Sequence, residues 1–124
     1  MLDSPADPGP RFERVDHGET VTVYVHGEVD LADRDRFRIA IHDALAVART
    51  ALYLDLSDVT FIDSSGVHAL LDARRATRSR NADFVLLTPS KPVLRVLQIC
   101  CVVDMFDIRD RVGVTSWSTA RFDA

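Results

Sequence analysis

The sequence has few of the residues that hold metals or disulfide frameworks. It contains two cysteines in 124 residues, Cys100 and Cys101, and they are adjacent. Consecutive Cα atoms lie about 3.8 Å apart, closer than in ordinary disulfides, so a bond between these two would be strained. No histidine or carboxylate stands at metal-ligand spacing from them. We therefore expect no metal site and no cofactor, and we expect at least one cysteine to be a small buried side chain.

Long apolar runs and a basic excess are also missing. No apolar stretch reaches the length of about 20 residues that crosses a bilayer, and the chain does not start with a secretion signal. These absences predict a cytoplasmic protein without membrane insertion. The formal net charge of −4 argues against direct nucleic-acid binding. The arginines of residues 74–80 are interpreted as cations that complement the negative end of a helix dipole.

Catalytic signatures are absent as well. The sequence has no glycine-rich phosphate loop, and Ser64 lacks the Gly-x-Ser-x-Gly flanks of a hydrolase nucleophile. Its histidines, His17, His26, His42 and His68, form no catalytic pattern, although His68 is four residues from Ser64 and therefore close to it on a helix. We expect that the protein is not an enzyme.

Strand and helix patterns alternate along most of the chain. Residues 1–10 hold three of the five prolines and little to bury, so they are predicted to be a disordered leader. Residues 11–124 are predicted to form one domain. Strands are expected at 11–16, 20–27, 51–56, 84–87 and within 104–109; helices are expected after Asp30 or Asp33, from Ser64 or Ser65, from 88–92, and around 115–122.

This order of elements predicts an α/β fold. Strand–helix–strand units with right-handed crossovers give a single mixed, largely parallel sheet of four or five strands with helices packed on it. The carboxyl ends of parallel strands meet at one edge of such a sheet, and functional residues gather there. Residues 27–30 and 63–66 are therefore expected at the same edge.

The most informative stretch is residues 55–67, Asp-Leu-Ser-Asp-Val-Thr-Phe-Ile-Asp-Ser-Ser-Gly-Val. An apolar strand leads into the Asp63–Gly66 turn, and an amphipathic segment follows at once. The unpaired N–H groups and the positive dipole end of a helix N-terminus favour negative charge, including phosphate. Two interpretations follow from the residues alone: Ser64 and Ser65 simply cap the helix, or one of them is phosphorylated.

Residues 52–71 resemble the STAS family of anti-sigma-factor antagonists, almost position for position through the strand, the turn and the following helix. Residues 27–31, Gly-Glu-Val-Asp-Leu, resemble the segment that begins the family's first helix, and residues 87–97 resemble its third-helix segment. The chain departs from the family at residues 100–102, where a Ser-Gly pair is common, and at residues 81–82, where glycines are common.

The resemblance implies that the unphosphorylated protein binds an anti-sigma factor of the serine-kinase type and frees a sigma factor. Phosphorylation of Ser64 would end this binding, because a new dianion meets the partner surface, and a phosphatase would reset the cycle. The implied partner-binding residues are Asp30, Asp63, Ser64, Ser65, Gly66 and His68. The family leaves an alternative: a constitutive accessory or scaffold subunit of a transport ATPase or a stress-signalling complex.

Overall fold

The predicted α/β fold is confirmed by the computed structural model, which describes residues 11–110. The predicted leader of residues 1–10 and the predicted helix at 115–122 lie outside the described residues. The elements are β1 (Arg11–His17), β2 (Thr20–Val29), the 3-10 helix η2 (Leu31–Asp33), α1 (Arg34–Val47), β3 (Ala51–Ile62), α2 (Ser64–Ser79), β4 (Asp83–Leu87), α3 (Lys91–Ile99), the 3-10 helix η3 (Val103–Met105) and β5 (Asp107–Arg109).

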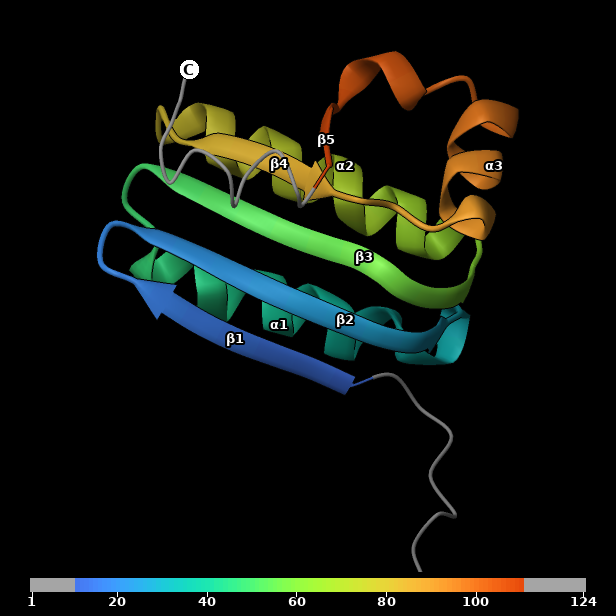
Figure 1. Cartoon of the computed structure of the whole chain (residues 1–124), viewed down its shortest axis with the longest axis horizontal. Coiled ribbons are helices and arrows are strands. Elements are labelled where there is room, and N and C mark those ends of the chain that lie inside the picture. The colour runs from blue at the N-terminus through green and yellow to red at the C-terminus, as the bar shows by residue number, and fades with distance from the viewer. Residues whose placement is uncertain (1–10, 111–124) are drawn as a thin grey trace, which may run out of the picture.

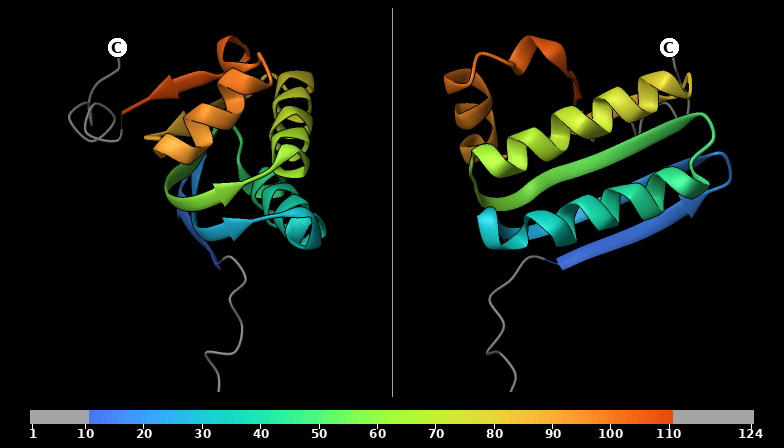
Figure 2. Two further views of the ribbon diagram at one scale, coloured as in Figure 1. Left: turned by 90° about the vertical axis from the view of Figure 1, so that its right-hand side faces the viewer. Right: turned by 180° about the vertical axis from the view of Figure 1, so that it is seen from behind.

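The strands form one five-stranded sheet in the order β1-β2-β3-β4-β5 (Figure 1). β1 is antiparallel to β2, and every other neighbouring pair is parallel. Figure 2 shows α1 and α2 side by side on one face of this sheet, with α3 at the end where β3 finishes. Parallel strands joined by helices produce this layering, because each crossover returns the chain to the same edge.

The core lies between the sheet and the two long helices. Alternate residues of a strand point to one face, and the helix-facing positions of β2, β3 and β4 are apolar. On the helices, Phe37, Ile41 and Leu45 of α1 and Val67 and Leu70 of α2 complete this layer. The strand residues that face it and are buried are Val21, Val23, Val25, Leu52, Leu54, Leu56, Phe84 and Leu86.

Two strands run further than the sequence indicated. Gly27 was expected to end β2 and Leu56 to end β3, but β2 continues to Val29 and β3 to Ile62. The pairing of the two strands shifts register between Tyr24 and His26 and again after Gly27, which has φ +97°. A glycine in this conformation accommodates a β-bulge, after which pairing resumes.

His26 of β2 forms side-chain hydrogen bonds to both neighbouring strands, β1 and β3, on the surface of the sheet. Its Nδ1 lies 2.6 Å from Asp58 Oδ2 of β3, and its Nε2 lies 2.9 Å from Glu13 Oε1 of β1. A neutral imidazole has one N–H, whereas two carboxylates accept two, so this geometry favours the doubly protonated ring. The hydrogen bond to Asp58 is the main cause that raises the pKa of His26; burial opposes the shift, and Glu13 adds to it.

The end of α3 corrects one expectation. Ser90 caps this helix, and both cysteines follow its last residue and are exposed. Cys101 has φ +59°, and the next residue, Val102, packs against the core. The predicted buried cysteine is therefore wrong, because the helix ends before Cys100. The last predicted strand is confirmed, since β5 lies within residues 104–109 and follows η3.

Between residues 11 and 110, no helix is long and apolar enough to cross a membrane.

Candidate functional site

The ends of β2 and β3 bring two acidic residues to adjacent positions. Val29 pairs with Ile62, the last residues of the two strands, and Asp30 and Asp63 follow directly. The backbone N–H of Asp63 donates to the Val29 carbonyl at 3.3 Å, so the strands stay joined up to this point. The predicted common edge is confirmed by this pairing. The left view of Figure 2 looks onto this end of the sheet.

Asp63 is the N-cap of α2. Its Oδ1 accepts from the backbone N–H of Ser65 at 3.0 Å and from that of Gly66 at 3.3 Å. Ser64 is therefore the first helical residue, which confirms the prediction that this helix begins at Ser64 or Ser65. Of the two interpretations of the turn, the one in which the serines cap the helix is wrong. The physical reason is local: Asp63 has extended backbone, and its carboxylate reaches the N–H groups that a serine cap would have satisfied.

Ser64 is exposed, and its hydroxyl makes no hydrogen bond to any residue between 11 and 110. His68, one turn further along the same helix face, is also exposed. A free hydroxyl at the first helical position is accessible to a modifying enzyme. The capping role belongs to Asp63, which leaves the Ser64 hydroxyl free.

Asp30 organises the other half of the site. Its Oδ1 accepts from the backbone N–H of Ala32 at 3.0 Å, and its own N–H donates to Asp33 Oδ2 at 3.5 Å, which forms a capping box over η2. Burial raises the pKa of Asp33 and the Asp30 side chain adds to the shift, whereas the hydrogen bond from the Asp30 backbone N–H lowers it. Arg36 lies 3.7 Å from the Asp33 carboxylate and offsets part of this charge.

Gly66 allows α2 to begin this close to the strands. A Cβ atom at Gly66 would lie 2.5 Å from Ile62 Cγ1 and 2.8 Å from Ile62 Cδ1. The family resemblance implies that Gly66 is a partner-binding residue. The residue that fills this space is Ile62 of the same chain, and Gly66 is buried.

Two apolar residues at this end were missed by the sequence analysis. Leu31, directly after Asp30, is 62% exposed, and Phe61, two residues before Asp63, is 46% exposed. Large exposed apolar side chains next to a polar rim are typical of protein-binding surfaces. The sequence does contain a sign of this role, because each is a large apolar residue within two positions of Asp30 or Asp63, the predicted site carboxylates.

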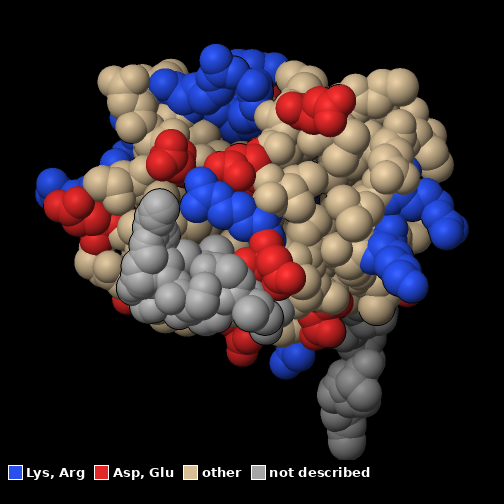
Figure 3. Space-filling view, turned by 45° about the horizontal axis from the view of Figure 1, so that its top comes forward, with Lys and Arg blue, Asp and Glu red and all other residues tan. Residues whose placement is uncertain are grey.

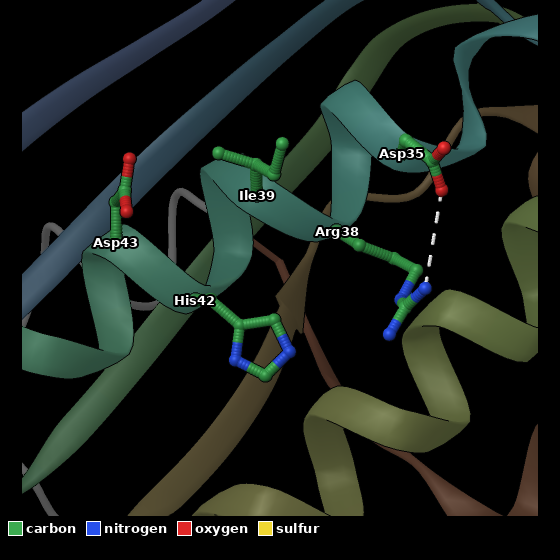
Figure 4. A pocket seen from close by; sticks show the side chains of 5 residues that line it. All are labelled: Asp35, Arg38, Ile39, His42 and Asp43. Carbon is green, nitrogen blue, oxygen red and sulfur yellow. Dashed lines mark ion pairs between the residues drawn. The ribbon is translucent and has the colours of Figure 1, made fainter.

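An open hollow of about 430 Å³ lies elsewhere, on α1 (Figure 4). Its described lining residues all come from this helix, and Arg38 lies 3.9 Å from Asp35. Figure 4 shows Arg38 and His42 directed toward α2, whereas Ile39 and Asp43 point away from it. Between residues 11 and 110, no group of histidine, cysteine, aspartate or glutamate side chains is arranged to hold a metal ion.

A family model described as the STAS domain matches residues 11–114. The chain belongs to the STAS domain family. The anti-sigma-B factor antagonist of Listeria monocytogenes is 24% identical to this STAS protein over 100 residues, covering 81% of this chain and 88% of the relative.

Solved structures of SpoIIAA, an anti-sigma factor antagonist, have the same fold. Its unphosphorylated form matches with a TM-score of 0.71 and 24% identity, covering 92% of this chain and 99% of the other. The phosphorylated form of SpoIIAA, a Bacillus cell fate determinant, matches with a TM-score of 0.66 and 22% identity, covering 88% and 100%. At this level of identity the likeness shows the fold.

Proposed function

We propose that this STAS protein is an anti-sigma-factor antagonist controlled by phosphorylation of Ser64. In this proposal the unmodified protein binds an anti-sigma factor that is also a serine kinase, and a sigma factor is released. Phosphorylation of Ser64 ends the binding, and a phosphatase restores it. The protein acts by binding and is not an enzyme.

The observation that carries the proposal is the exposed, unbonded hydroxyl of Ser64 at the first position of α2. Family membership adds support, since the relatives include an anti-sigma-B factor antagonist. The exposed side chains of Leu31 and Phe61 supply apolar contact area at the same end of the sheet. Leu31 directly follows Asp30, and Phe61 lies two residues before Asp63.

The physics of the modification favours a change at the interface over a change of fold. A phosphate carries nearly two negative charges at neutral pH, and a helix N-terminus tolerates such a charge. A partner docked beside Asp30 and Asp63 would face a third anionic group. Repulsion and desolvation of this kind are worth several kcal/mol, on the order of a hundredfold in affinity.

The first experiment is intact-mass and phosphopeptide analysis of the protein purified from its native host. We expect a single phosphate on Ser64, lost in Ser64→Ala and retained in Ser65→Ala. Phosphate on Ser65, or none under either growth or stress conditions, would count against the proposal.

The second experiment measures affinity for the host's anti-sigma-factor kinases by calorimetry. Wild type and Ser64→Ala should bind one of them equally, and Ser64→Glu should bind about a hundredfold more weakly. Ser79→Glu serves as the matched control, because it adds the same charge to an exposed serine at the far end of α2. Constitutive binding to a transport ATPase or a signalling scaffold, with Ser64→Glu as tight as wild type, would instead favour the accessory-subunit alternative.

A further inference from the structure

The far end of α2 carries a basic face. Leu71, Arg74, Arg75 and Arg78 follow the i, i+3, i+4, i+7 spacing that places side chains on one side of a helix. With Met105 of η3 they line an open hollow of about 250 Å³. A neighbouring hollow of about 180 Å³ shares Arg74, Arg78 and Met105 with the first. The two hollows therefore form one continuous depression, here named the arginine groove.

Two of these arginines are available to a ligand. Arg75 donates to Asp72 at 2.9 Å, whereas Arg74 and Arg78 make no ion pair with any residue from 11 to 110. Met105, on the other wall, is 44% exposed. Figure 3 shows basic atoms gathered over this part of α2, with acidic atoms bordering them.

Acidic residues beside the arginine groove limit the kind of ligand that it can bind. Asp83 and Asp107 line the second hollow together with Arg74 and Arg78, so the positive charge is confined to one end. A long polyanion such as a nucleic acid would extend over these carboxylates, in a protein whose net charge is already −4. A short segment that combines carboxylates with one apolar side chain fits both the charge and the partly apolar wall.

We propose that the arginine groove binds an acidic segment of a partner protein. Carboxylates of that segment pair with Arg74 and Arg78, and an apolar side chain packs against Leu71 and Met105. Arg74 and Arg78 are ten and fourteen residues from Ser64, which is about 15 and 21 Å along a helix. The groove is thus a second interaction surface, and its use does not depend on Ser64.

The test uses a fluorescein-labelled peptide, Asp-Glu-Leu-Glu-Asp, and measures binding by fluorescence anisotropy at low ionic strength. The double variant Arg74→Glu/Arg78→Glu should bind at least about tenfold more weakly than wild type. Arg34→Glu/Arg38→Glu is the matched control, because it changes the net charge equally at the same spacing on α1. The control should stay within about twofold of wild type, and so should Ser64→Glu. Unfolding midpoints verify that each variant is folded.

A separate measurement tests the apolar contact with Met105. Met105→Ser should weaken binding of the leucine-containing peptide but not of a peptide with serine in its place. A single-stranded DNA oligonucleotide and phosphatidylglycerol vesicles serve as rival anionic probes. The proposal is overturned by equal losses in both double variants, by tighter binding of either rival probe, or by the absence of saturable peptide binding.

Discussion

Gly66 lies against Ile62 so closely that a Cβ atom at Gly66 would stand 2.5 Å from Ile62 Cγ1. Ile62 is the last residue of β3 and is buried, so its branched side chain has little space into which it can move. The contact fixes how near the first turn of α2 approaches the ends of β2 and β3. The position of Ser64 depends on this approach.

Replacing Gly66 with alanine should destabilise the fold by about 1–3 kcal/mol, the usual effect of an added methyl group in a packed interior. Urea unfolding followed by circular dichroism measures the loss. Ser64→Ala, two residues away and exposed, should change the stability by less than about 0.5 kcal/mol. Equal stability of Gly66→Ala and wild type would show that Ile62 repacks freely.

The Asp63 carboxylate should have a capping role that is separable from its charge. Asp63→Ala removes the acceptor for two backbone N–H groups and should cost about 1 kcal/mol in the free energy of unfolding. Asp63→Asn keeps an oxygen acceptor and should retain most of the stability, because asparagine caps helices about as well. Denaturant unfolding of both variants distinguishes the roles; a loss in Asp63→Asn as large as in Asp63→Ala would assign the effect to charge.

Ser90 joins α3 to β3 through one hydroxyl. It donates to the Val59 carbonyl at 2.6 Å and accepts from the backbone N–H of Val93 at 3.4 Å. Ser90→Ala should therefore cost about 1–2 kcal/mol, since it removes a cap and leaves a partly buried carbonyl without this donor. Ser79→Ala, an exposed serine at the end of α2, is the control. Thermal unfolding that ranks the two variants equally would contradict the prediction.

The two hydrogen bonds that hold His26 between Asp58 and Glu13, here named the His26 clamp, should make the free energy of unfolding depend on pH. The pKa of His26 in the folded state is raised above its ordinary value of 6.5. Its stabilisation is therefore fully present below pH 6.5 and is lost as the pH rises through the raised folded value. The folded state binds the proton more tightly than the unfolded chain does.

The measurement is the free energy of unfolding at about pH 6 and about pH 9. The wild type should lose more stability between these conditions than His26→Gln does, because the variant lacks the titrating ring. His42→Gln, which replaces an exposed histidine of α1, should follow the wild type. An identical pH dependence in wild type and His26→Gln would exclude the clamp as the cause.

The features that the sequence predicted correctly are local ones. The strand expected at residues 20–27 is found in β2, and the helix expected after Asp30 or Asp33 is α1. Placing Asp30 and Asp63 at one edge needed only the parallel order of the strands. The role of Ser64 in phosphorylation stays a prediction, as do the partner contacts of Ser65, Gly66 and His68.

The features that the sequence did not predict depend on contacts between distant residues. Gly27 looks like a strand end, and only pairing with β3 turns it into a bulge. The hydrogen bonds of His26 reach Glu13 and Asp58, which are 13 and 32 positions away in the sequence, and no periodicity relates such positions. The capping role went to Asp63 and not to a serine because three adjacent residues all favour that position, and backbone geometry decided between them.

Because Asp63 already occupies the backbone N–H groups of Ser65 and Gly66, a phosphate on Ser64 would find its nearest donors taken. It would also stand beside the Asp63 carboxylate, whose charge repels it. The unmodified chain would then be the more stable of the two forms. Phosphorylation would load the domain with a small strain, and dephosphorylation would release it.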